Sequence, residues 1–426
     1  MTTVSGPAPV EFDGFHPMYR ENPYPSYRRA RAAGAFCPFQ LGPVPVHIAT
    51  RYEAASAILQ SPDWGHGYRD GISPFRPNVK AEDVAGSFLA MDPPDHTRLR
   101  ALVGKAFTPR MVARLAQSID ALVRKLVDAG AEQGELDVVG GLARPVSMAV
   151  MCELIGIPQQ DSATFGDWGR AIARGTDPDF TLTAEDIENR HAASEAFAAY
   201  FRDLIAFRRA RPAEDLVSGL AAVEERGDVL TERELLGVLS LLWVAGVETT
   251  VNLIGNGVLA LLRHPEQQRL LRDRPELAAS AVDEMLRYDP PVHFTIRVAL
   301  ADITVSGHRF RRGDGVVVLM ASAGRDESVF PDADTFDITR YAGATPARRH
   351  LGFGLGPHYC LGAPLARMEA EAEITELLRR TPELRLANDN LSCLTSLAHR
   401  GVSALPLALD GRRAWPCGRN SDFWSS

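Results

Sequence analysis

The chain has 426 residues, a formal net charge of −8, 45% hydrophobic residues and 23% charged residues. These values describe a globular chain, and the acidic balance excludes a protein whose whole surface binds nucleic acid or an anionic membrane. The five cysteines are scattered, which indicates no disulfide framework and fits a reducing cytoplasm. We expect no secretory leader, and the longest apolar run, residues 235–247, has 13 residues where a membrane span needs about 20.

The first hundred residues predict short elements and one long loop. Residues 21–34 predict a helix entered through prolines, and residues 36–50 predict a β-hairpin. Residues 61–91 are rich in glycine and proline and predict a loop, which at this length is usually either functional or mobile. Its aromatic content argues against a disordered linker: Trp64, Tyr68, Phe75 and Phe88.

A helix is predicted from residue 92 onward, with Asp92 as its cap and a proline in its first turn. His96 and Arg100 are four residues apart, so both side chains lie on one helical face. Two such donors can bind a pair of carboxylates, although the same spacing is typical of a solvated face. Amphipathic helices are expected to follow over residues 110–130, 143–156, 161–173 and 184–211.

Residues 235–263 predict one long apolar helix of about 40 Å, which must cross the interior. Its centre, residues 245–250, reads AGVETT. Thr249 can donate to the carbonyl of Ala245, which bends a helix, and the small residues leave room for a ligand at the bend. A buried Glu248 must be paired or functional. The alternative is an exposed glutamate beside an ordinary kink.

The last part of the chain predicts another helix and several strands. Residues 275–288 predict a helix in which Glu284 and Arg287 are three apart and favour an ion pair. Residues 292–319 and 386–409 predict short strands separated by turns.

The segment HLGFGLGPHYCLG, residues 350–362, leads into a predicted helix over residues 361–380. Cys360 lies at the positive end of this helix, which favours thiolate over thiol and suits a metal-bound sulfur. Gly354 and Gly356 permit a tight turn and the close approach of a flat group. Two alternatives are weaker. A buried free thiol is the usual state of a lone cysteine, and a zinc site would need further ligands in a recognisable pair.

Six residues match every fixed position of the pattern F-G-x-G-x-H-x-C-x-G: Phe353, Gly354, Gly356, His358, Cys360 and Gly362. This segment resembles the haem-binding loop of the cytochrome P-450 family. In the same order as in that family, AGVETT resembles its oxygen-activating segment and Glu284-x-x-Arg287 resembles its ExxR motif. The resemblance extends from residue 23 to about residue 409 and looks like a soluble bacterial class found in secondary metabolism.

The resemblance implies a mainly α fold with small β-sheets (α+β), a triangular helical prism whose long central helix lies over haem b. It implies one catalytic domain over residues 13–410, with disordered tails at residues 1–12 and 411–426. Cys360 would be the axial metal ligand, and Glu248 and Thr249 would deliver protons during dioxygen cleavage. The other implied haem contacts are His96, Arg100, Ala245, Gly246, Arg297, Phe353, Gly354, Gly356, His358 and Gly362. The implied structural network is Glu284, Arg287 and Arg340.

The implied activity is that of a monooxygenase that hydroxylates or epoxidises a small apolar natural product. The implied pocket contains Phe88, Leu242, Ala245, Val292, His293, Phe294 and Leu397. His293 is either a polar substrate contact or a hydrogen-bonded core residue. The alternatives are a peroxide-driven enzyme, against which Glu248 and Thr249 count, an oxidase that couples phenols without oxygen insertion, and a haem-based sensor or carrier.

The same resemblance implies O₂ as a co-substrate and electrons from outside the chain. Since no flavin module is visible, NAD(P)H-derived electrons would arrive through a ferredoxin and its reductase, steered by arginines beside the cysteine loop: Arg348, Arg349 and Arg367. We expect a cytoplasmic monomer with neither a nucleic-acid nor a membrane partner. Substrate identity, the type of oxidation and any tethering of the substrate to a carrier protein stay open.

Overall fold

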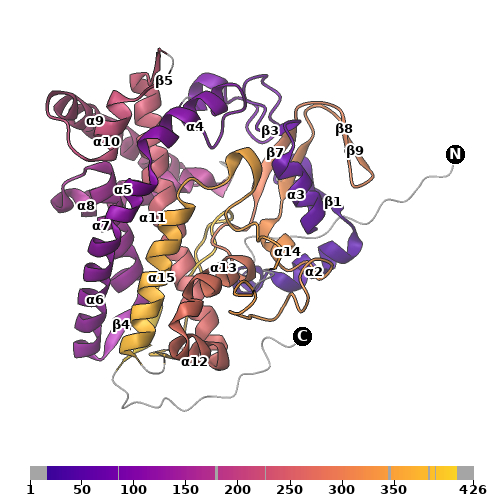
Figure 1. Ribbon diagram of the computed structural model, residues 1–426. Coiled ribbons are helices and arrows are strands. Elements are labelled where there is room, and N and C mark those ends of the chain that lie inside the picture. Colours follow the sequence, from indigo (N-terminus) through magenta and orange to yellow (C-terminus); the bar gives the residue numbers. More distant parts are fainter. Residues whose placement is uncertain are drawn as a thin grey trace.

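The computed structural model describes residues 17–409, except residues 85, 178–180, 226, 344–346, 382–383 and 389. The two expected tails, residues 1–12 and 411–426, lie outside the described residues. Helices make up one side of the molecule in Figure 1, and most strands gather on the opposite side, around α3 and α14. The fold is therefore mainly helical with small sheets, as the sequence predicts.

The α-helices are α1 (Pro17–Glu21), α2 (Tyr24–Ala33), α3 (Tyr52–Gln60), α4 (Asp95–Ala106), α5 (Pro109–Arg114), α6 (Ala116–Gln133), α7 (Arg144–Ile155), α8 (Ser162–Ala173), α9 (Ala184–Ala210), α10 (Leu216–Ala222), α11 (Glu232–Arg263), α12 (Pro265–Asp273), α13 (Ala278–Tyr288), α14 (Met320–Gly324) and α15 (Ala363–Arg380). One π-helical stretch, η2 (Val138–Ala143), leads into α7.

The largest sheet has the strand order β1 (Phe36–Leu41), β2 (Val44–Ala49), β10 (Gly315–Val318), β7 (Thr295–Ala299) and β3 (Trp64–Gly65). Only β10 and β2 run parallel; the other neighbours in this sheet are antiparallel. The smaller sheets contain β11 (Arg385–Leu386), β12 (Pro406–Ala408) and β4 (Glu135–Asp137), then β5 (Glu224–Glu225) with β6 (Asp228–Val229), and β8 (Ile303–Val305) with β9 (His308–Phe310).

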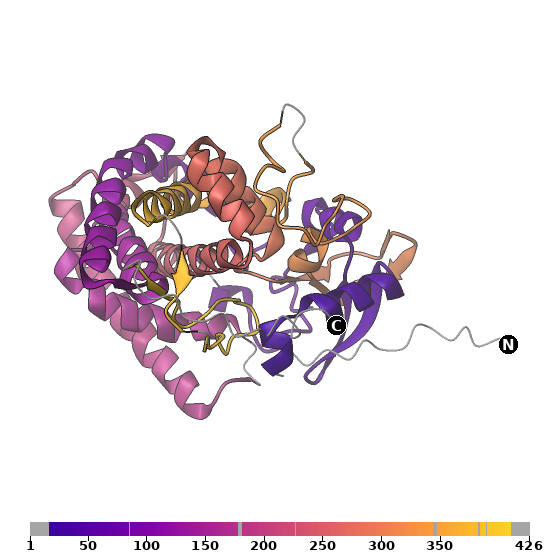
Figure 2. The same ribbon diagram turned by 90° about the horizontal axis from the view of Figure 1, so that it is seen from below.

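Helix α11 is the interior element on which the helical side is built. It begins at a capping box in which the Thr231 hydroxyl accepts from the Glu234 N–H, while the Glu234 carboxylate accepts from the Thr231 N–H. Its second half is buried almost all round, and it packs against α7, α13 and α15. Figure 2 shows α15 alongside α11 in the middle of the helical side.

Two helical stretches, Val138–Ile155 and Glu232–Arg263, are long and apolar enough to cross a membrane by length and composition alone. More than half of each apolar window is buried inside the protein, 61% and 56% respectively. Both are interior helices, and their apolar character is explained by packing against neighbouring helices.

One predicted cap is wrong. Helix α4 begins at Asp95, not near Asp92, and the Asp92 carboxylate instead accepts the backbone N–H groups of His66 and Gly67 at 2.7 and 2.8 Å. A proline disfavours helical backbone angles in the residue that precedes it. The helix therefore starts only after Pro93 and Pro94. Asp92 therefore anchors the loop after β3.

Candidate active site

The cysteine loop contains two left-handed glycines. Gly354 and Gly356 have φ values of 69° and 70°, where side chains are strained. A Cβ on Gly356 would also lie 2.3 Å from the carbonyl oxygen of Leu59, so α3 leaves no room for a side chain there. The Cys360 N–H donates to the Phe353 carbonyl at 3.0 Å and closes the turn. The glycines thus fix where the sulfur of Cys360 lies.

The electrostatics of Cys360 differ from the expectation. Desolvation by the surrounding protein raises the pKa of the Cys360 thiol, while the N–H groups of Gly362 and Ala363 and the charge of Arg100 act to lower it. The effect of the helix start is present but smaller than the effect of desolvation, so the protein alone does not favour the thiolate. A metal cation bound by Cys360 would supply the missing stabilisation, since coordination deprotonates a thiol.

Two threonine hydroxyls of α11 bond back to the carbonyls of the small residues one turn earlier. The Thr249 hydroxyl donates to the Ala245 carbonyl at 2.6 Å, and the Thr250 hydroxyl donates to the Gly246 carbonyl at 2.9 Å. Such back-bonding competes with the helical ladder and bends a helix. Ala245 is exposed although it lies in the middle of an interior helix, so this point of α11 borders open space.

Glu248 has a partner that the sequence did not reveal. Arg144, the first residue of α7, donates to Glu248 Oε1 at 2.6 Å and to Oε2 at 3.3 Å. Both side chains are largely covered, at 22% and 16% exposure. The bidentate geometry fixes the carboxylate beside Thr249. Since Arg144 lies about a hundred positions away in the sequence and belongs to no motif, no local signal identifies it.

The four cationic or imidazole side chains expected at the haem come together. The rings of His96 and His358 are 4.2 Å apart, and Arg100 donates to the Tyr359 carbonyl beside Cys360. Arg297 donates to the Thr295 hydroxyl at 3.0 Å and to the Ile296 carbonyl at 2.7 Å. They come from α4, β7 and the cysteine loop, so the fold gathers them from distant segments.

Three buried histidine nitrogens of this cluster lack partners in the described residues. Both ring nitrogens of His96 and Nδ1 of His358 have no hydrogen-bond partner in the described part of the chain. Burial, then the charges of Arg100 and Arg297, lowers the pKa of His96 to about 4, and burial also lowers the pKa of Arg297 to about 10. Buried donors without acceptors are costly. They fit a dianionic group such as the two propionates of a haem whose iron meets Cys360.

The predicted structural network is fully paired. Arg287 donates to both carboxylate oxygens of Glu284 at 2.7 Å, and Arg340 Nε lies 3.2 and 3.3 Å from the same oxygens. Arg287 also donates to the carbonyls of Gly324 and Ala333 at 2.7 Å. Glu284 and Arg287 are completely buried. The network therefore joins α13 to the long segment that leads to the cysteine loop.

Comparison with known proteins agrees with this geometry. Residues 4–381 match the family Cytochrome P450. The chain is 36% identical over 410 residues to the polyketide biosynthesis cytochrome P450 PksS of Bacillus subtilis, covering 93% of this chain and 98% of that protein. The chain belongs to the cytochrome P450 family. It is a cytochrome P450 monooxygenase, and the family's cofactor is a haem with a thiolate ligand.

Two further relatives of this P450 have informative names. The mycinamicin IV hydroxylase/epoxidase of Micromonospora griseorubida is 41% identical over 365 residues, which is 84% of this chain and 88% of that protein. The structure of P450BioI in complex with an acyl carrier protein carrying hexadec-9Z-enoic acid matches with a TM-score of 0.82 at 34% identity, over 92% of this chain and 98% of that one.

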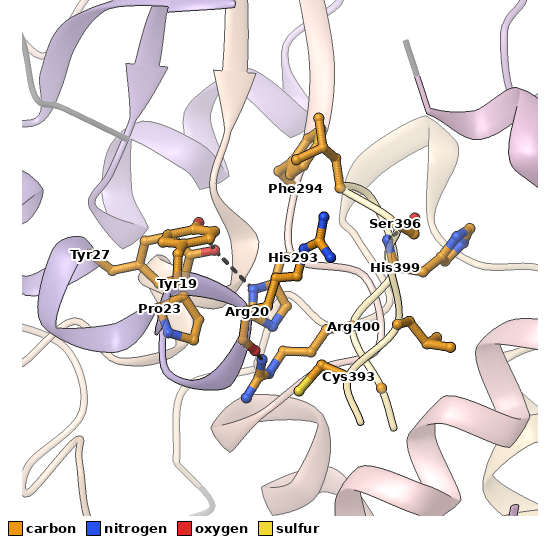
Figure 3. Close-up of a pocket in the computed structure, with 13 residues that line it drawn as sticks. Tyr19, Arg20, Pro23, Tyr27, His293, Phe294, Cys393, Ser396, His399 and Arg400 are labelled. Atoms are coloured by element: carbon orange, nitrogen blue, oxygen red, sulfur yellow. Dashed lines mark hydrogen bonds between the residues drawn. The ribbon is translucent and has the colours of Figure 1, made fainter. Parts of the chain in front are cut away.

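The pocket residues expected in this P450 lie in different parts of the structure. Leu242 and Ala245 lie on α11, close to Thr249. Phe88 is buried, and the Arg100 guanidinium lies 5.8 Å from its ring. Val292 forms a β-bridge with His399. Phe294 and Leu397 lie at a small side cavity (Figure 3).

His293 takes the second of its two alternatives and is a hydrogen-bonded core residue. Its Nδ1 lies 2.9 Å from the Tyr27 hydroxyl (Figure 3). Its Nε2 lies 3.4 Å from Asp289, which also accepts from Arg400 at 2.7 Å. The adjoining cavity measures about 40 Å³. That volume holds a few waters and no natural product. One ring nitrogen of His293 thus has a structural partner in Tyr27, whereas Nε2 lies near Asp289 but makes no hydrogen bond in the described residues.

Leu397 belongs to a turn that is tied to the connection after α8. One carboxylate oxygen of the buried Asp177 accepts from the Ser396 hydroxyl and from the N–H groups of Leu397 and Ala398, at 2.9, 2.9 and 3.2 Å. The other oxygen accepts from Arg174 at 2.8 Å. Asp177 therefore links the connection after α8 to this turn, and it is a second residue that sequence patterns did not indicate.

The arginines expected to steer an electron donor are partly neutralised. Arg367 donates to Asp283 at 2.7 and 2.9 Å, and Arg348 donates to Glu53 at 3.3 Å. The guanidinium of Arg349 stacks 4.2 Å from the ring centroid of Tyr359, next to Cys360. Any steering charge on this rim therefore comes mainly from Arg349.

Proposed function

We propose that this P450 inserts one oxygen atom from O₂ into a small apolar natural product, by hydroxylation or epoxidation, in secondary metabolism. The observations that carry the proposal are the buried ring nitrogens of His96 and His358, which have no partner in the described residues and lie near Cys360, and the Glu248–Thr249 step of α11 with its back-bond and ion pair. A haem b bound there supplies the activation of dioxygen. The protein's own side chains supply binding, orientation and protons.

Each group has a distinct task in this proposal. Cys360 holds the metal, with its sulfur restrained by the Gly362 and Ala363 N–H groups. His96, Arg100, Arg297 and His358 bind the propionates through charge-assisted hydrogen bonds. Thr249 and Glu248 move protons toward the open side of α11, and Arg144 positions the Glu248 carboxylate for this purpose. The Glu284–Arg287–Arg340 network holds the cysteine loop in place.

The substrate class rests on the relatives. PksS is named for polyketide biosynthesis, and the mycinamicin IV enzyme is named as a hydroxylase and epoxidase. In this proposal a polyketide or macrolide skeleton would contact the apolar residues of α11 near Ala245. Delivery of the substrate on a carrier protein is a second possibility, supported by the acyl-carrier-protein complex of P450BioI.

The remaining assignments complete the proposal. Residues 13–410 act as one catalytic domain of a cytoplasmic monomer. Two electrons from NAD(P)H arrive through a ferredoxin and its reductase. The phenol-coupling oxidase and the haem sensor remain the rival functions, since neither requires insertion of oxygen.

The first test is the absorption spectrum of the reduced protein with carbon monoxide. The proposal expects the strongly red-shifted Soret band of thiolate-ligated haem, and Cys360→Ser should abolish that band. A histidine-like band, or a protein that takes up no haem, would contradict the assignment. Turnover of a macrolide or polyketide panel with NADPH, ferredoxin and reductase then separates a monooxygenase from a coupling oxidase by the incorporation of ¹⁸O from ¹⁸O₂.

The proton-delivery assignment has its own test. Thr249→Ala should keep haem and the red-shifted band but divert electrons to hydrogen peroxide, so that product formed per NADPH consumed falls severalfold. Thr250→Ala, one residue further along α11 with the same type of back-bond, is the matched control and should leave this ratio unchanged. If Thr249→Ala forms as much product per NADPH as the wild type, Thr249 does not deliver protons.

A further inference from the structure

A third histidine lies against the donor cluster and belongs to no motif that the sequence reveals. His66 follows β3, and its ring centroid is 5.3 Å from that of His358, edge to face. Its other side stacks on Tyr68 at 6.2 Å with an interplanar angle of 7°. The residue is 7% exposed, and its Nε2 is a buried atom without a hydrogen-bond partner in the described residues.

Strand register explains why His66 points to this cluster. Strands β3 and β7 pair antiparallel with Trp64 opposite Ala299 and Gly65 opposite Val298. Continuing the register by one residue places His66 opposite Arg297. Residues directly opposite each other in an antiparallel pair project to the same face of the sheet. His66 therefore shares the face on which Arg297 meets His96 and His358.

The backbone around His66 is pinned, so the position of its ring is fixed by the fold. The Asp92 carboxylate accepts the N–H groups of His66 and Gly67, and a Cβ on Gly65 would lie 2.3 Å from that carboxylate. The left-handed φ of 72° at Gly67 then turns the chain away. Both flanking glycines are required for this approach, and the anchor is the buried Asp92.

The groups that face the His66 ring include one cation, Arg297, while the Asp92 carboxylate binds the backbone N–H of His66. Burial, then Arg297, His358 and His96, lowers the pKa of His66 well below the usual value. The ring is therefore neutral, with one N–H to donate. A buried donor with no acceptor in the described residues, close to the Arg297 guanidinium, is a feature that a bound anion resolves.

We propose that His66 is a further haem-binding residue, a hydrogen-bond donor to a propionate from the loop after β3. This inference rests on the proposed haem site and extends it to a segment outside the P450 motifs. With His66, the propionate-binding residues come from the loop after β3 as well as from α4, β7 and the cysteine loop. The loop over residues 66–92 is then coupled to the cofactor through one side chain and through Asp92.

The test is the rate at which the ferric holoenzyme transfers its haem to excess apomyoglobin. His66→Phe keeps an aromatic ring for stacking on Tyr68 but removes the donor, and it should speed haem transfer about tenfold. The propionate bending mode in the resonance Raman spectrum should also shift. His47→Phe, the same change on β2 outside the cluster, is the matched control and should transfer haem at the wild-type rate.

A conservative variant separates hydrogen bonding from packing. His66→Gln retains an N–H donor but loses the ring, so it should transfer haem more slowly than His66→Phe and keep the wild-type Raman mode. If His66→Phe takes up no haem, the Gln variant alone decides: retained haem with an unshifted mode supports the proposal, and faster transfer with a shifted mode overturns it. A wild-type transfer rate and mode in His66→Phe would overturn the inference while leaving the haem site intact. Absence of haem from the wild type would instead overturn the proposed function.

Discussion

Two buried clusters of charged side chains in this P450 have opposite hydrogen-bonding states. In the first, Glu284 accepts from Arg287 and Arg340, and the remaining guanidinium groups donate to backbone carbonyls. In the second, His96 and His358 have buried ring nitrogens without acceptors beside Arg297. Both clusters are buried. The side chains around Glu284 are fully paired, whereas ring nitrogens of His96 and His358 have no acceptor in the described residues.

The difference separates residues that serve the fold from residues that serve a ligand. A buried ion pair is tolerable only when nearly all its donors and acceptors are satisfied, as around Glu284. A set of buried donors with no acceptor is stable only when a partner outside the chain completes it. The two clusters should therefore respond in opposite ways to the same substitution, an arginine replaced by leucine.

The largest effect is expected for Arg287→Leu. This change leaves the completely buried Glu284 without its main partner, and breaking a buried pair costs about 3–5 kcal/mol of folding free energy. We expect little folded, haem-loaded protein, measured by the yield and the thermal midpoint. Arg379→Leu, which removes an exposed arginine paired with Glu376, should stay within about 0.5 kcal/mol of the wild type. Normal yield of Arg287→Leu would show that the network is not what holds the structure.

Arg297→Leu should act on the ligand and spare the fold. Its guanidinium bonds only to the Thr295 hydroxyl and the Ile296 carbonyl among the described hydrogen bonds, and burial already lowers its pKa to about 10. We expect haem loss faster by roughly ten- to a hundredfold, the value of about 1.5–3 kcal/mol for one charged hydrogen bond. The thermal midpoint of the haem-free protein should not fall. A large drop in that midpoint would place Arg297 with the structural cluster.

The same contrast explains how far sequence reasoning reaches. The cysteine loop, the AGVETT segment and the Glu284–Arg287 pair are local patterns, and α11 and α15 follow from apolar periodicity and helix-start residues. Sequence reasoning missed Arg144, Asp177 and His66 because their partners lie 104, 219 to 221 and 292 positions away, respectively. Such contacts depend on tertiary packing and strand register, which one sequence does not encode in any short pattern.

Asp92 and Cys360 show a second reason for error. The predicted helix cap at Asp92 and the predicted helix-dipole effect at Cys360 both rest on neighbouring residues in the sequence. In both cases contacts with distant parts of the fold had the larger effect. Asp92 is drawn to two N–H groups of the β3 loop, and desolvation outweighs the helix start at Cys360. A short sequence pattern predicts which side chains are available to cap a helix or bind a metal. Their burial in the folded protein decides which partner they take and whether they are ionised.

A third buried cluster extends the comparison to like charges. Glu369 and Glu373 are one turn apart on α15 and almost fully buried, and both carboxylate oxygens of Glu373 lack a partner in the described chain. Glu369 accepts only from the Ser147 hydroxyl, at 2.9 Å. Burial raises the pKa of Glu369 to about 8, and burial together with Glu369 raises the pKa of Glu373 well above its usual value.

This cluster predicts a pH-dependent stability of defined sign. The folded state holds protons that the unfolded chain releases above pH ~4.5, so the free energy of unfolding falls as pH rises, by about 1.4 kcal/mol per pH unit for Glu369. The contribution of Glu369 to this fall ends near pH 8, its raised pKa, while Glu373 adds a fall of its own. Glu369→Gln should make the fall of the thermal midpoint between pH 5 and 8 shallower, while the exposed-site control Glu53→Gln should follow the wild type. An unchanged slope in Glu369→Gln would show that Glu369 is ionised in the folded protein.

The smallest effect on folding stability is expected for a substitution of Arg144. Its pair with Glu248 is fully formed but less buried than the Glu284–Arg287 pair. The pair is partly exposed, so Arg144→Met should change stability by only about 1 kcal/mol or less. Its consequence should be seen in coupling instead, because the unrestrained Glu248 carboxylate no longer lies beside Thr249 in one orientation. We expect an unchanged carbon monoxide spectrum and a two- to fivefold lower ratio of product to NADPH, with Arg144→Lys partly restoring it. If coupling in Arg144→Met equals that of the wild type, the Arg144–Glu248 pair serves only to join α7 to α11.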